Sequence, residues 1–379
     1  MRILLTTGIF RPELGGPATY TAELAKRLKT AGHTVAVITY SNKGVFSLDA
    51  EYQFPIMRII RGNKIWNYIR YFFAVLAYAP HYDFIYSLDW FSAGIPVMWA
   101  AKFRGKKYIV RVGGGYIWEK YLAQGKPPMS LKAFYEKKLY RRYPLMYLLI
   151  KKVLRNASEI IFNSDDQREL YQKHYKLNPE KLHTIFNPVP EHRFGTLLKT
   201  HHRPQARDKE IVFAGRFIKM KNVESLVRAF AELKDHSFTL LLIGEGPLEE
   251  ILRKLVIELK LRERVTFMAP LSQADLYRRI ANCYYVVIPS WTDVSPNQAY
   301  ECLAIGIPFL ISKENYLSIS EQLPVKIDPG SVADIAEKMN SLSDFKNYVQ
   351  FVEQQRAITF HHTWNEVLRD HMRIFKQVS

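Results

Sequence analysis

The twenty residues at positions 289–308, PSWTDVSPNQAYECLAIGIP, hold the pattern that decides the fold of the second half of the chain. They are typical of the end of a buried strand, a polar loop and a short helix. Ser295 is expected to cap that helix, because Gln298 follows at the capping-box spacing with a proline between them. Gly306 and Pro308 are expected to end the helix after about three turns. The pattern therefore predicts a helix start at the C-terminal edge of a strand.

The predicted helix start has the properties of an anion site. Free N–H groups and the helix dipole attract negative charge at such a position. Two carboxylates lie close to it in sequence, Asp293 in the loop and Glu301 inside the helix. Because ionised carboxylates accept hydrogen bonds from hydroxyl groups, the combination suits a ligand that is part phosphate and part polyhydroxylated, such as a nucleotide sugar.

Length and composition indicate a globular protein of two domains. The chain has 379 residues, of which 48% are hydrophobic, and this length exceeds what one core accommodates. Cys283 and Cys302 lie in apolar stretches, which favours buried, reduced thiols in a cytoplasmic protein. The longest apolar run, residues 71–80, is half of the ~20 residues that a membrane-spanning helix needs. The apolar run after Met1 is too short for a secretory signal, so we expect a cytoplasmic protein that does not span a membrane.

The net charge of +18 is concentrated in the first half of the chain. Residues 1–200 contain 31 Lys and Arg against 14 Asp and Glu, whereas residues 201–379 contain 23 against 22. Segments 64–78 and 130–155 are both basic and aromatic, and basic amphipathic segments bind anionic membrane surfaces. In the alternative interpretation, their apolar residues pack on the first sheet while the cations face solvent. We expect an anionic membrane surface as a partner of this half.

Both halves alternate strand-like and helix-like segments, which indicates two parallel sheets covered by helices. The expected strands are residues 3–7, 34–39, 84–87, 108–112, 159–163, 211–214, 239–243, 265–268, 284–288 and 308–311. The expected helices include residues 17–29, 92–103, 223–234, 248–260, 272–281 and 296–305. The expected boundaries are a first domain at 1–190, a linker at 191–209, a second domain at 210–358, and a last helix at 359–379 that returns to the first domain.

Four segments in this order resemble glycosyltransferase family 4. They are FRPELGGPATYTAELAKRL at 10–28, FAGRFIKMKN at 213–222, LLIGEGPLEEIL at 241–252, and the segment at 289–308. The resemblance covers nearly the whole chain, although the first domain matches mainly through its Gly-Gly loop. It implies an α/β protein of the GT-B fold, with two facing Rossmann-like domains.

The resemblance also implies catalytic roles for Arg216, Lys221, Asp293 and Glu301. Arg presents a planar fork to phosphate oxygens and Lys a mobile point charge, so the first two are expected to stabilise the leaving diphosphate. An isolated pair of this kind is otherwise two solvated surface cations. Asp293 is expected to hold a hydroxyl of the transferred sugar and Glu301 the ribose hydroxyls. The sequence departs from the family at two positions, with Asn222 where glycine is usual and Asp293 where glutamate is commoner.

Further site residues follow from the same resemblance. The expected donor-binding residues are Gly16, Gly244, Glu245, Gly246, Val294, Ser295, Pro296 and Asn297. For the glycines at 244 and 246, an ordinary tight turn between strand and helix is the alternative. Many family members carry a histidine just after the strand expected at 108–112, but this chain has RVGGGYIWEK there. The acceptor-side candidates are therefore Arg111, Gly114, Tyr116, Trp118 and Glu119, and a structural role for Trp118 is equally open.

The function implied is transfer of a hexose-type sugar from a UDP-sugar or GDP-sugar, with retention, to a hydroxyl of a lipid-linked or membrane-presented glycan. Such an enzyme would serve cell-surface polysaccharide or glycolipid synthesis, at the inner face of the plasma membrane. No metal site or other cofactor is expected, because the eleven histidines show no metal-like clustering. One alternative is a nucleotide-sugar epimerase on the same fold. Another is a basic nucleic-acid-binding protein, which explains the charge but not the helix start with its paired acids; we expect no nucleic-acid partner.

Overall fold

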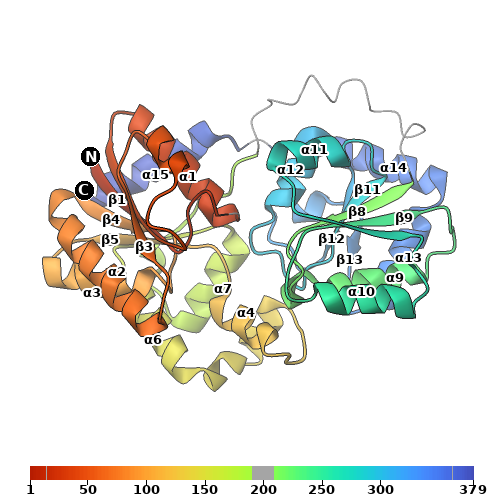
Figure 1. Cartoon of the computed structure of the whole chain (residues 1–379), viewed down its shortest axis with the longest axis horizontal. Coiled ribbons are helices and arrows are strands. Elements are labelled where there is room, and N and C mark those ends of the chain that lie inside the picture. The colour runs from red at the N-terminus through yellow and green to blue at the C-terminus, as the bar shows by residue number, and fades with distance from the viewer. Residues whose placement is uncertain (14, 190–208, 361) are drawn as a thin grey trace. The chain divides into compact units, whose positions relative to one another are not determined.

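The computed structural model describes residues 1–13, 15–189, 209–360 and 362–379 of the chain. These residues form two compact units, each with its own parallel sheet (Figure 1). The first unit comprises Met1–Ile117, Lys138–Asn187 and Trp364–Ser379, and the second comprises Trp118–Lys137 and Pro188–Thr363. The expected two-domain α/β architecture is confirmed. The expected linker at 191–209 lies, except for Lys209, outside the described residues.

The first unit contains a seven-stranded parallel sheet in the order β3-β2-β1-β4-β5-β6-β7. Its strands are β1 (Arg2–Thr7), β2 (Thr34–Ser41), β3 (Ile56–Ile60), β4 (Phe84–Ser87), β5 (Tyr108–Val112), β6 (Glu159–Phe162) and β7 (Leu182–Thr184). Every residue of β4 and β5 is buried, as expected of short apolar strands inside a parallel sheet covered on both faces. The edge strands β3 and β7 were not expected from the sequence.

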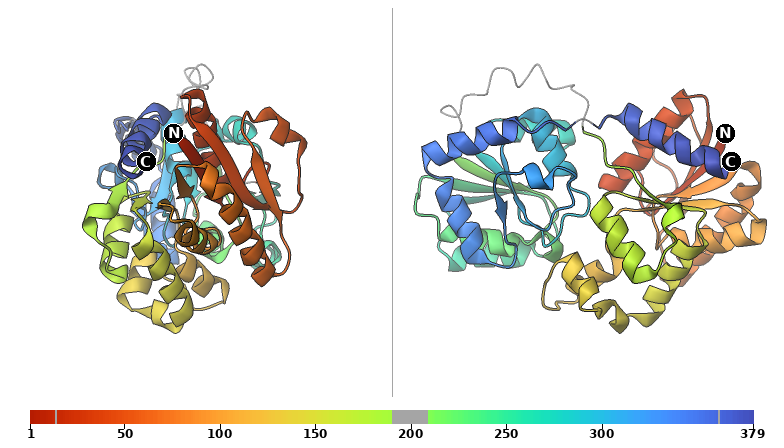
Figure 2. Two further views of the ribbon diagram at one scale, coloured as in Figure 1. Left: turned by 90° about the vertical axis from the view of Figure 1, so that its left-hand side faces the viewer. Right: turned by 180° about the vertical axis from the view of Figure 1, so that it is seen from behind.

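Helices cover both faces of this sheet (Figures 1 and 2). On one face, α1 (Gly16–Thr30) packs beside α15 (Trp364–Val378). The other face carries α2 (Lys64–Tyr78), α3 (Gly94–Arg104) and α6 (Pro144–Asn156). The remaining helices of the first half are α4 (Tyr116–Ala123), α5 (Leu131–Glu136) and α7 (Asp165–Tyr175).

The last helix, α15, belongs to the first unit, which confirms the expected return of the chain. Val367, Ile374 and Phe375 join a core cluster with residues of β1, β2 and β4. The ring nitrogen Nε2 of the buried His371 lies 3.0 Å from the hydroxyl of Tyr86 on β4. The apolar face of α15 therefore packs on the sheet, and the one buried histidine on this face has a hydrogen-bonding partner there.

The second unit contains a six-stranded parallel sheet in the order β10-β9-β8-β11-β12-β13. The strands are β8 (Glu210–Ala214), β9 (Thr239–Ile243), β10 (Val265–Met268), β11 (Tyr285–Ile288), β12 (Phe309–Ser312) and β13 (Lys326–Ile327). The helices are α9 (Val223–Ala231), α10 (Glu249–Glu258), α11 (Gln273–Ile280), α12 (Asn297–Ile305), α13 (Val332–Ser341) and α14 (Phe345–Arg356). The strand order reverses between β8 and β11. In doubly wound sheets, ligands bind beyond the C-terminal ends of the strands at such a reversal.

Candidate functional site

The loops that follow β8 and β11 bring three charged residues to this reversal point. The loop after β8 carries Arg216 and Lys221, and the loop after β11 carries Asp293. Nζ of Lys221 lies 3.5 Å from Oδ2 of Asp293, with 25% of the lysine side chain exposed but only 7% of the aspartate side chain. Arg216 is exposed, and its guanidinium has no hydrogen bond or ion pair with other residues that the structure describes. The first loop thus offers two accessible cations, and one of them, Lys221, lies beside a buried carboxylate.

Backbone hydrogen bonds to a neighbouring loop hold Asp293 in place. Its N–H donates to the carbonyl of Glu314 at 3.0 Å, and its carbonyl accepts from the N–H of Tyr316 at 3.1 Å. These bonds form a parallel bridge between Asp293 and Asn315. A carboxylate fixed in this way is preorganised to accept a hydrogen bond from a ligand hydroxyl.

The loop after β8 explains the family departure at Asn222. This residue has φ 55°, in the left-handed region that glycine adopts freely and asparagine tolerates better than most residues. Its side-chain amide donates to the carbonyl of Pro329 at 2.8 Å. Asparagine can therefore adopt a left-handed backbone conformation at this position, where glycine is usual in the family. Lys219, two residues before Lys221, is held by Glu224 at 2.8 Å and is a distinct surface ion pair.

The turn of Gly244, Glu245 and Gly246 packs directly on the loop after β8. A Cβ atom on Gly244 would lie 1.9 Å from the carbonyl oxygen of Gly215, and one on Gly246 would lie 2.5 Å from that of Phe217. The N–H of Phe217 donates to the carbonyl of Glu245 at 2.8 Å. The close packing of the two turns is thus enough to explain why residues 244 and 246 are both glycine. A donor contact by this turn, whose Glu245 side chain is exposed, stays a prediction.

The expected capping box at Ser295 is wrong. The helix α12 begins at Asn297, and its cap position is occupied by Pro296, which makes no side-chain cap hydrogen bond. The N–H of Asn297 donates to the carbonyl of Ser295 at 2.7 Å, and this tight turn delays the helix start. The expected end is confirmed, because Gly306 adopts φ 68° as the C-terminal cap.

This altered start changes what α12 can offer to an anion. The N–H groups of Asn297 and Ala299 are already bonded to the carbonyls of Ser295 and Pro296. The helix dipole still favours negative charge at this end, but these two amides are not free to bind a phosphate as the turn stands. Val294 is buried, with 5% of its surface exposed. Phosphate contacts by the backbone of residues 294–297 remain a prediction.

Glu301 belongs to a hydrogen-bonded group contributed by α11 and α12. Nε2 of Gln273 lies 2.8 Å from Oε1 of Glu301 and 2.8 Å from the hydroxyl of Tyr277. Burial raises the pKa of Glu301, while hydrogen bonds from Gln273 and Tyr277 act in the opposite direction. Gln273 and Tyr277 were missed in the sequence, although their i,i+4 spacing on one helix face gave a signal.

A segment from the first half of the sequence supports the loop that carries Asp293. The backbone N–H of Leu131, which begins α5, donates to Oγ1 of the buried Thr292 at 2.8 Å. Thr292 Oγ1 in turn donates to the carbonyl of Trp291 at 2.8 Å. Ser130 hydrogen-bonds the side chain of Glu314, and burial raises the pKa of that carboxyl. The start of α5 and the loop that carries Asp293 are thereby tied together within the second unit.

The boundary between the two units falls within α4 and divides the acceptor-side candidates. Trp118 and Glu119 belong to the second unit, whereas Arg111, Gly114 and Tyr116 belong to the first. Trp118 is fully buried, and its Nε1 donates to the carbonyl of Met129 at 2.8 Å. The structure therefore gives Trp118 the packing role that was the alternative. Glu119 is exposed.

The three candidates in the first unit are engaged in internal contacts. Nη2 of the buried Arg111 donates to the carbonyl of Ile185 at 3.0 Å and to Oδ1 of Asn187 at 2.9 Å. The carbonyl of Gly114 accepts from the hydroxyl of Tyr171 at 3.0 Å. The ring of Tyr116 stacks on Phe91 with 3.7 Å between centroids. Gly16 is the first residue of α1, also in the first unit.

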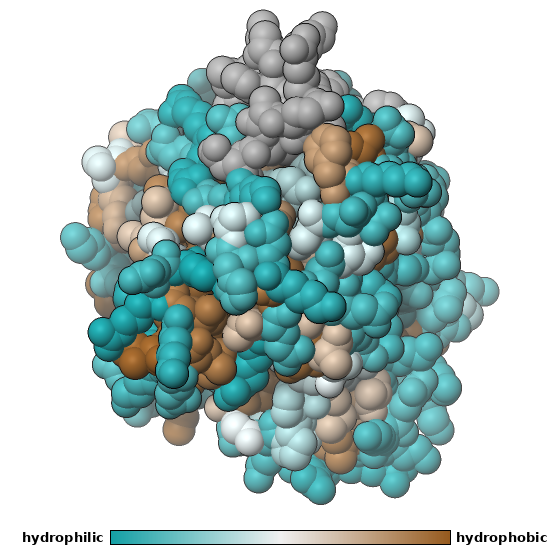
Figure 3. Space-filling model, turned by 90° about the vertical axis from the view of Figure 1, so that its right-hand side faces the viewer, coloured by the Kyte–Doolittle hydropathy of each residue, from teal (hydrophilic) through white to brown (hydrophobic). Residues whose placement is uncertain are grey.

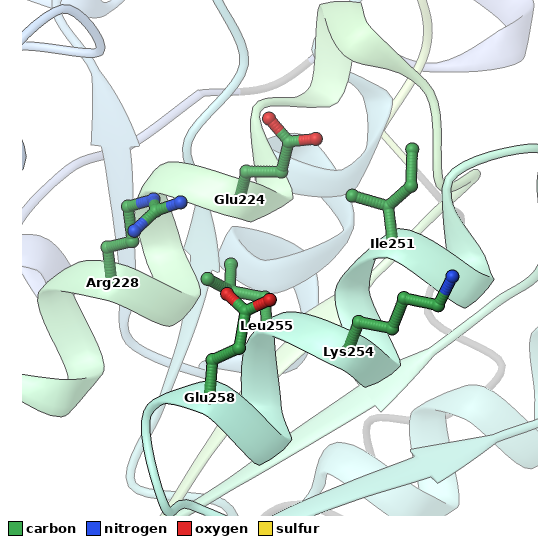
Figure 4. Close-up of a pocket in the computed structure, with 6 residues that line it drawn as sticks. All are labelled: Glu224, Arg228, Ile251, Lys254, Leu255 and Glu258. Carbon is green, nitrogen blue, oxygen red and sulfur yellow. The ribbon is translucent and has the colours of Figure 1, made fainter.

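A separate groove lies between α9 and α10 in the second unit (Figure 4). Glu224, Arg228, Lys254 and Glu258 place charges of both signs around Ile251 and Leu255. No residue of the candidate site lines it. Among the described residues, no group of three or more His, Cys, Asp or Glu could hold a metal ion. Within the same residues, no helix combines the length and apolar character needed to cross a membrane.

Comparison with known proteins identifies the family. The model for Glycosyltransferase Family 4 matches residues 14–193, and that for Glycosyl transferases group 1 matches residues 196–357. One relative is N-acetylgalactosamine-N,N'-diacetylbacillosaminyl-diphospho-undecaprenol 4-alpha-N-acetylgalactosaminyltransferase of Campylobacter jejuni, which is 30% identical over 41% of this chain and 41% of its own length. The chain spans 60%, 41% and 52% of the length of the first three curated relatives that it matches.

Solved structures show the same fold along the whole chain. Anabaena HepE in complex with UDP-glucose aligns with a TM-score of 0.76 at 15% identity, covering 100% of both chains. Sucrose-phosphate synthase of Thermosynechococcus elongatus aligns with a TM-score of 0.75 at 20% identity, covering 100% of this chain and 99% of that one. With two parallel-sheet units and both family models matched in order, the chain belongs to glycosyltransferase family 4 and has the GT-B fold.

Proposed function

We propose that this glycosyltransferase moves a hexose-type sugar from a UDP-sugar or GDP-sugar to a hydroxyl group of a lipid-linked or membrane-presented glycan. The observation that carries the proposal is the Lys221–Asp293 contact between the two loops that flank the strand reversal of β8 and β11, with Arg216 exposed on the first of these loops. HepE, a protein of the same fold, was solved with UDP-glucose. The Campylobacter relative is named for a diphospho-undecaprenol acceptor. Both names support the proposed substrate classes.

The two cations act on the leaving group. Cleavage of the bond between the sugar C1 and the phosphate oxygen leaves negative charge on the diphosphate, and preorganised cations stabilise such charge. Arg216 is exposed, and Lys221 is held by Asp293 only at 3.5 Å. Lys221 therefore needs a small side-chain rotation to reach a phosphate. That movement frees the Asp293 carboxylate to accept a hydrogen bond from a sugar hydroxyl.

The transfer proceeds with retention and without an enzyme nucleophile or a metal ion. The acceptor oxygen forms its bond to C1 on the face that the diphosphate leaves, and the acceptor proton passes to the leaving phosphate oxygen. Glu301 accepts hydrogen bonds from the ribose hydroxyls, oriented by Gln273 at 2.8 Å. The residues with direct roles are thus Arg216, Lys221, Asp293 and Glu301.

The proposed site of action is the cytoplasmic face of the plasma membrane, in the synthesis of a cell-surface polysaccharide or glycolipid. The proposal follows from the class of acceptor and from the excess of 31 Lys and Arg over 14 Asp and Glu in residues 1–200. Anionic lipids of the cytoplasmic leaflet attract such a surface.

A thermal-shift screen with UDP, GDP, ADP and their sugar conjugates tests the donor. A ligand at 100 times its Kd stabilises the folded state by about 2.7 kcal/mol, so one base should give a clear shift that the others do not. Product analysis then follows the sugar with and without a glycan acceptor. A nucleotide sugar that isomerises without acceptor would establish an epimerase instead. Salt-sensitive DNA binding unaffected by nucleoside diphosphates would establish a nucleic-acid-binding protein.

A further inference from the structure

Three neighbouring helices of the first unit form a surface without acidic residues. The helices α2, α3 and α6 cover one face of the first sheet, with α3 in contact with both others. Together they contain no Asp or Glu. Their seven cations are Lys64, Arg70, Lys102, Arg104, Lys151, Lys152 and Arg155. We refer to the outer surface of these three helices as the basic helix layer.

The basic helix layer also exposes large apolar side chains. Among the described residues, thirteen large hydrophobic side chains are exposed, and seven of them lie on these three helices. They are Ile65, Trp66, Ile69, Phe73, Phe103, Leu145 and Leu148. Trp66 is 61% exposed, Phe103 72% and Leu145 69%. Apolar side chains gathered in this way mark an interaction surface, whereas single exposed ones do not.

These side chains are presented outward because α2 is fixed to the sheet by its other side. Its buried residues are Tyr71 and Val75, and the Tyr71 hydroxyl donates to the carbonyl of Ile38 at 2.8 Å. The same hydroxyl accepts from the N–H of Thr7 at 3.0 Å. Phe103 on α3 packs edge-on against Phe72 on α2, with ring centroids 5.7 Å apart. The exposed rings of the two helices therefore belong to one continuous surface.

Cations and apolar rings alternate on this surface. Nζ of Lys152 on α6 lies 4.4 Å from the centroid of the Trp99 ring on α3. Long basic side chains that lie over aromatic rings can direct their charge to lipid headgroups while the rings enter the interface. Such a mixture is typical of segments that lie in the plane of an anionic membrane surface.

The other helices within the described residues lack this combination. α10 in the second unit exposes Ile251 and Ile257, but it carries three Glu beside its two cations. On the opposite face of the first sheet, α1 and α15 contribute none of the exposed large hydrophobic side chains and do contain acidic residues. The second-unit side shown in Figure 3 is mostly hydrophilic, with hydrophobic residues in separate patches.

We propose that the basic helix layer is the surface by which this protein docks on an anionic lipid bilayer. Seven cations without an acid match the charge of anionic headgroups. The same charge disfavours a second copy of this face, because a symmetric contact would bring the cations of both copies together. Nucleic-acid bases stack on aromatic rings, but they have no comparable contact with aliphatic side chains. The exposed aliphatic residues Ile65, Leu145 and Leu148 therefore favour lipid acyl chains over nucleic acid as the partner. This inference depends on the proposed function in one respect only: docking would bring the enzyme close to a membrane-presented acceptor.

Flotation with vesicles tests the proposal without any sugar donor, so its failure and that of the proposed function are distinguishable. The full chain is mixed with phosphatidylcholine vesicles that contain or lack phosphatidylglycerol. We expect binding to the anionic vesicles only. The triple variant K151Q/K152Q/R155Q should lower the partition coefficient about 100-fold. Each lost cation is expected to lower the coefficient by less than about tenfold, and the three effects multiply. The variant W66S/F73S should lower it about tenfold or more.

Matched controls separate docking from folding. The substitution Ile257→Ser on α10 removes an apolar residue that is 48% exposed, against 61% for Trp66 and 59% for Phe73, and should leave vesicle binding unchanged. All the substituted side chains are exposed except Lys151, which is half-buried, so thermal melts should stay close to wild type. Equal binding to neutral and anionic vesicles would overturn the proposal. Vesicle binding at the wild-type level by both K151Q/K152Q/R155Q and W66S/F73S would also overturn it. A third contradictory outcome is a wild-type protein that does not bind vesicles but forms a dimer in solution, which W66S/F73S dissociates.

Brominated acyl chains test insertion itself. Trp66 is the one exposed tryptophan among the described residues, so bound vesicles with brominated lipids should quench its fluorescence. The variant Trp66→Phe should bind as wild type and lose most of that quenching. Binding without any quenching in the wild-type protein would contradict insertion of the apolar residues.

Discussion

The ammonium group of Lys221 lies 3.5 Å from the carboxylate of Asp293, and this contact joins the two loops that follow β8 and β11. The residues are 72 positions apart in the sequence. The distance is long for an ion pair, and the lysine is the more exposed partner. An anion that enters at the strand reversal can therefore attract Lys221 at small cost, since a partly exposed pair of this kind contributes little to stability.

Removing either cation should slow sugar transfer without unfolding the protein. Arg216→Ala and Lys221→Ala are each expected to lower kcat/KM by roughly 10²–10³, the effect of losing one preorganised group that stabilises developing negative charge. The matched control is Lys219→Ala, which removes a neighbouring cation held by Glu224 at 2.8 Å. Steady-state kinetics checks the prediction. Equal losses in the control and the two site variants would mean that general surface charge, and not the site, is responsible.

Replacing Asp293 with asparagine should separate sugar recognition from diphosphate binding. The Asp293→Asn substitution would release Lys221 from its charged partner, so free nucleoside diphosphate should bind as tightly as in wild type or more tightly. Turnover of the sugar nucleotide should fall roughly 10–100-fold, because a hydrogen bond to a charged group contributes about 1.5–3 kcal/mol. Calorimetry and kinetics on the same variant check both parts. Weaker diphosphate binding in D293N would contradict the proposed division of roles.

The raised pKa of Glu301 predicts a pH dependence with a defined sign. Burial favours the protonated carboxyl in the folded protein. Its contribution to stability is therefore complete below the pKa of the unfolded chain and is lost as pH rises through the folded pKa. Glu301→Gln should be more stable than wild type at neutral pH, by about a degree or two in Tm, and the difference should vanish in acid. Nucleotide affinity should fall roughly tenfold in the variant at neutral pH.

Thermal melts and nucleotide-binding constants check this prediction. They are measured across roughly pH 4–8, a range that begins near the ordinary pKa of a carboxyl group and extends above it. Gln273→Ala serves as a companion variant, since it removes the donor to Glu301 without changing the charge. A Tm of Glu301→Gln below that of wild type at neutral pH would contradict the sign of the shift.

Much of the sheet architecture was predictable because its strands are short apolar runs with polar boundaries. The strands β4, β5, β9 and β10 have the expected limits. The edge strands β3, β7 and β13 were missed, since an edge strand needs fewer buried residues and β13 has only two residues in all. Pairing with a neighbour, and not local sequence, defines such strands.

The sequence singled out the charged residues of the candidate site but not the contacts that support them. Arg216, Lys221 and Asp293 stood out because their types and spacing carry the family pattern. The expected cap at Ser295 failed because a tight turn places Pro296 at the start of α12, and alternative caps compete at this level of detail. No local signal marks the bond from Leu131 to Thr292, which joins positions 161 residues apart. Contacts of this kind arise from tertiary packing alone.

The close packing of two turns predicts a large penalty for Gly244→Ala. The added Cβ would lie 1.9 Å from the carbonyl oxygen of Gly215, so the turns must separate, and we expect a loss of about 4 kcal/mol or more in the free energy of unfolding. Gly32→Ala is the matched control, because Gly32 also has positive φ but nothing lies within 4 Å of its added Cβ. The control should cost about 1–2 kcal/mol. Similar denaturation midpoints for the two variants would contradict the packing account.

The hydrogen bond from Leu131 predicts a coupled effect on stability and turnover. Thr292→Val leaves the buried N–H of Leu131 without its acceptor, at a cost of about 1–3 kcal/mol. Because the next residue is Asp293, kcat/KM should fall as the loop loosens, while Thr292→Ser should restore both quantities. Urea unfolding and kinetics on the pair of variants check this. Normal turnover in a destabilised Thr292→Val variant would show that the bond serves folding alone.

The central claim is that the second unit holds the donor diphosphate between Arg216 and Lys221 at the reversal of β8 and β11. A crystal structure with a bound UDP-sugar or GDP-sugar tests it most directly. We predict diphosphate density within hydrogen-bonding distance of both side chains, with Lys221 turned away from Asp293. Diphosphate density at any other place, with the Lys221–Asp293 contact intact, would contradict the account.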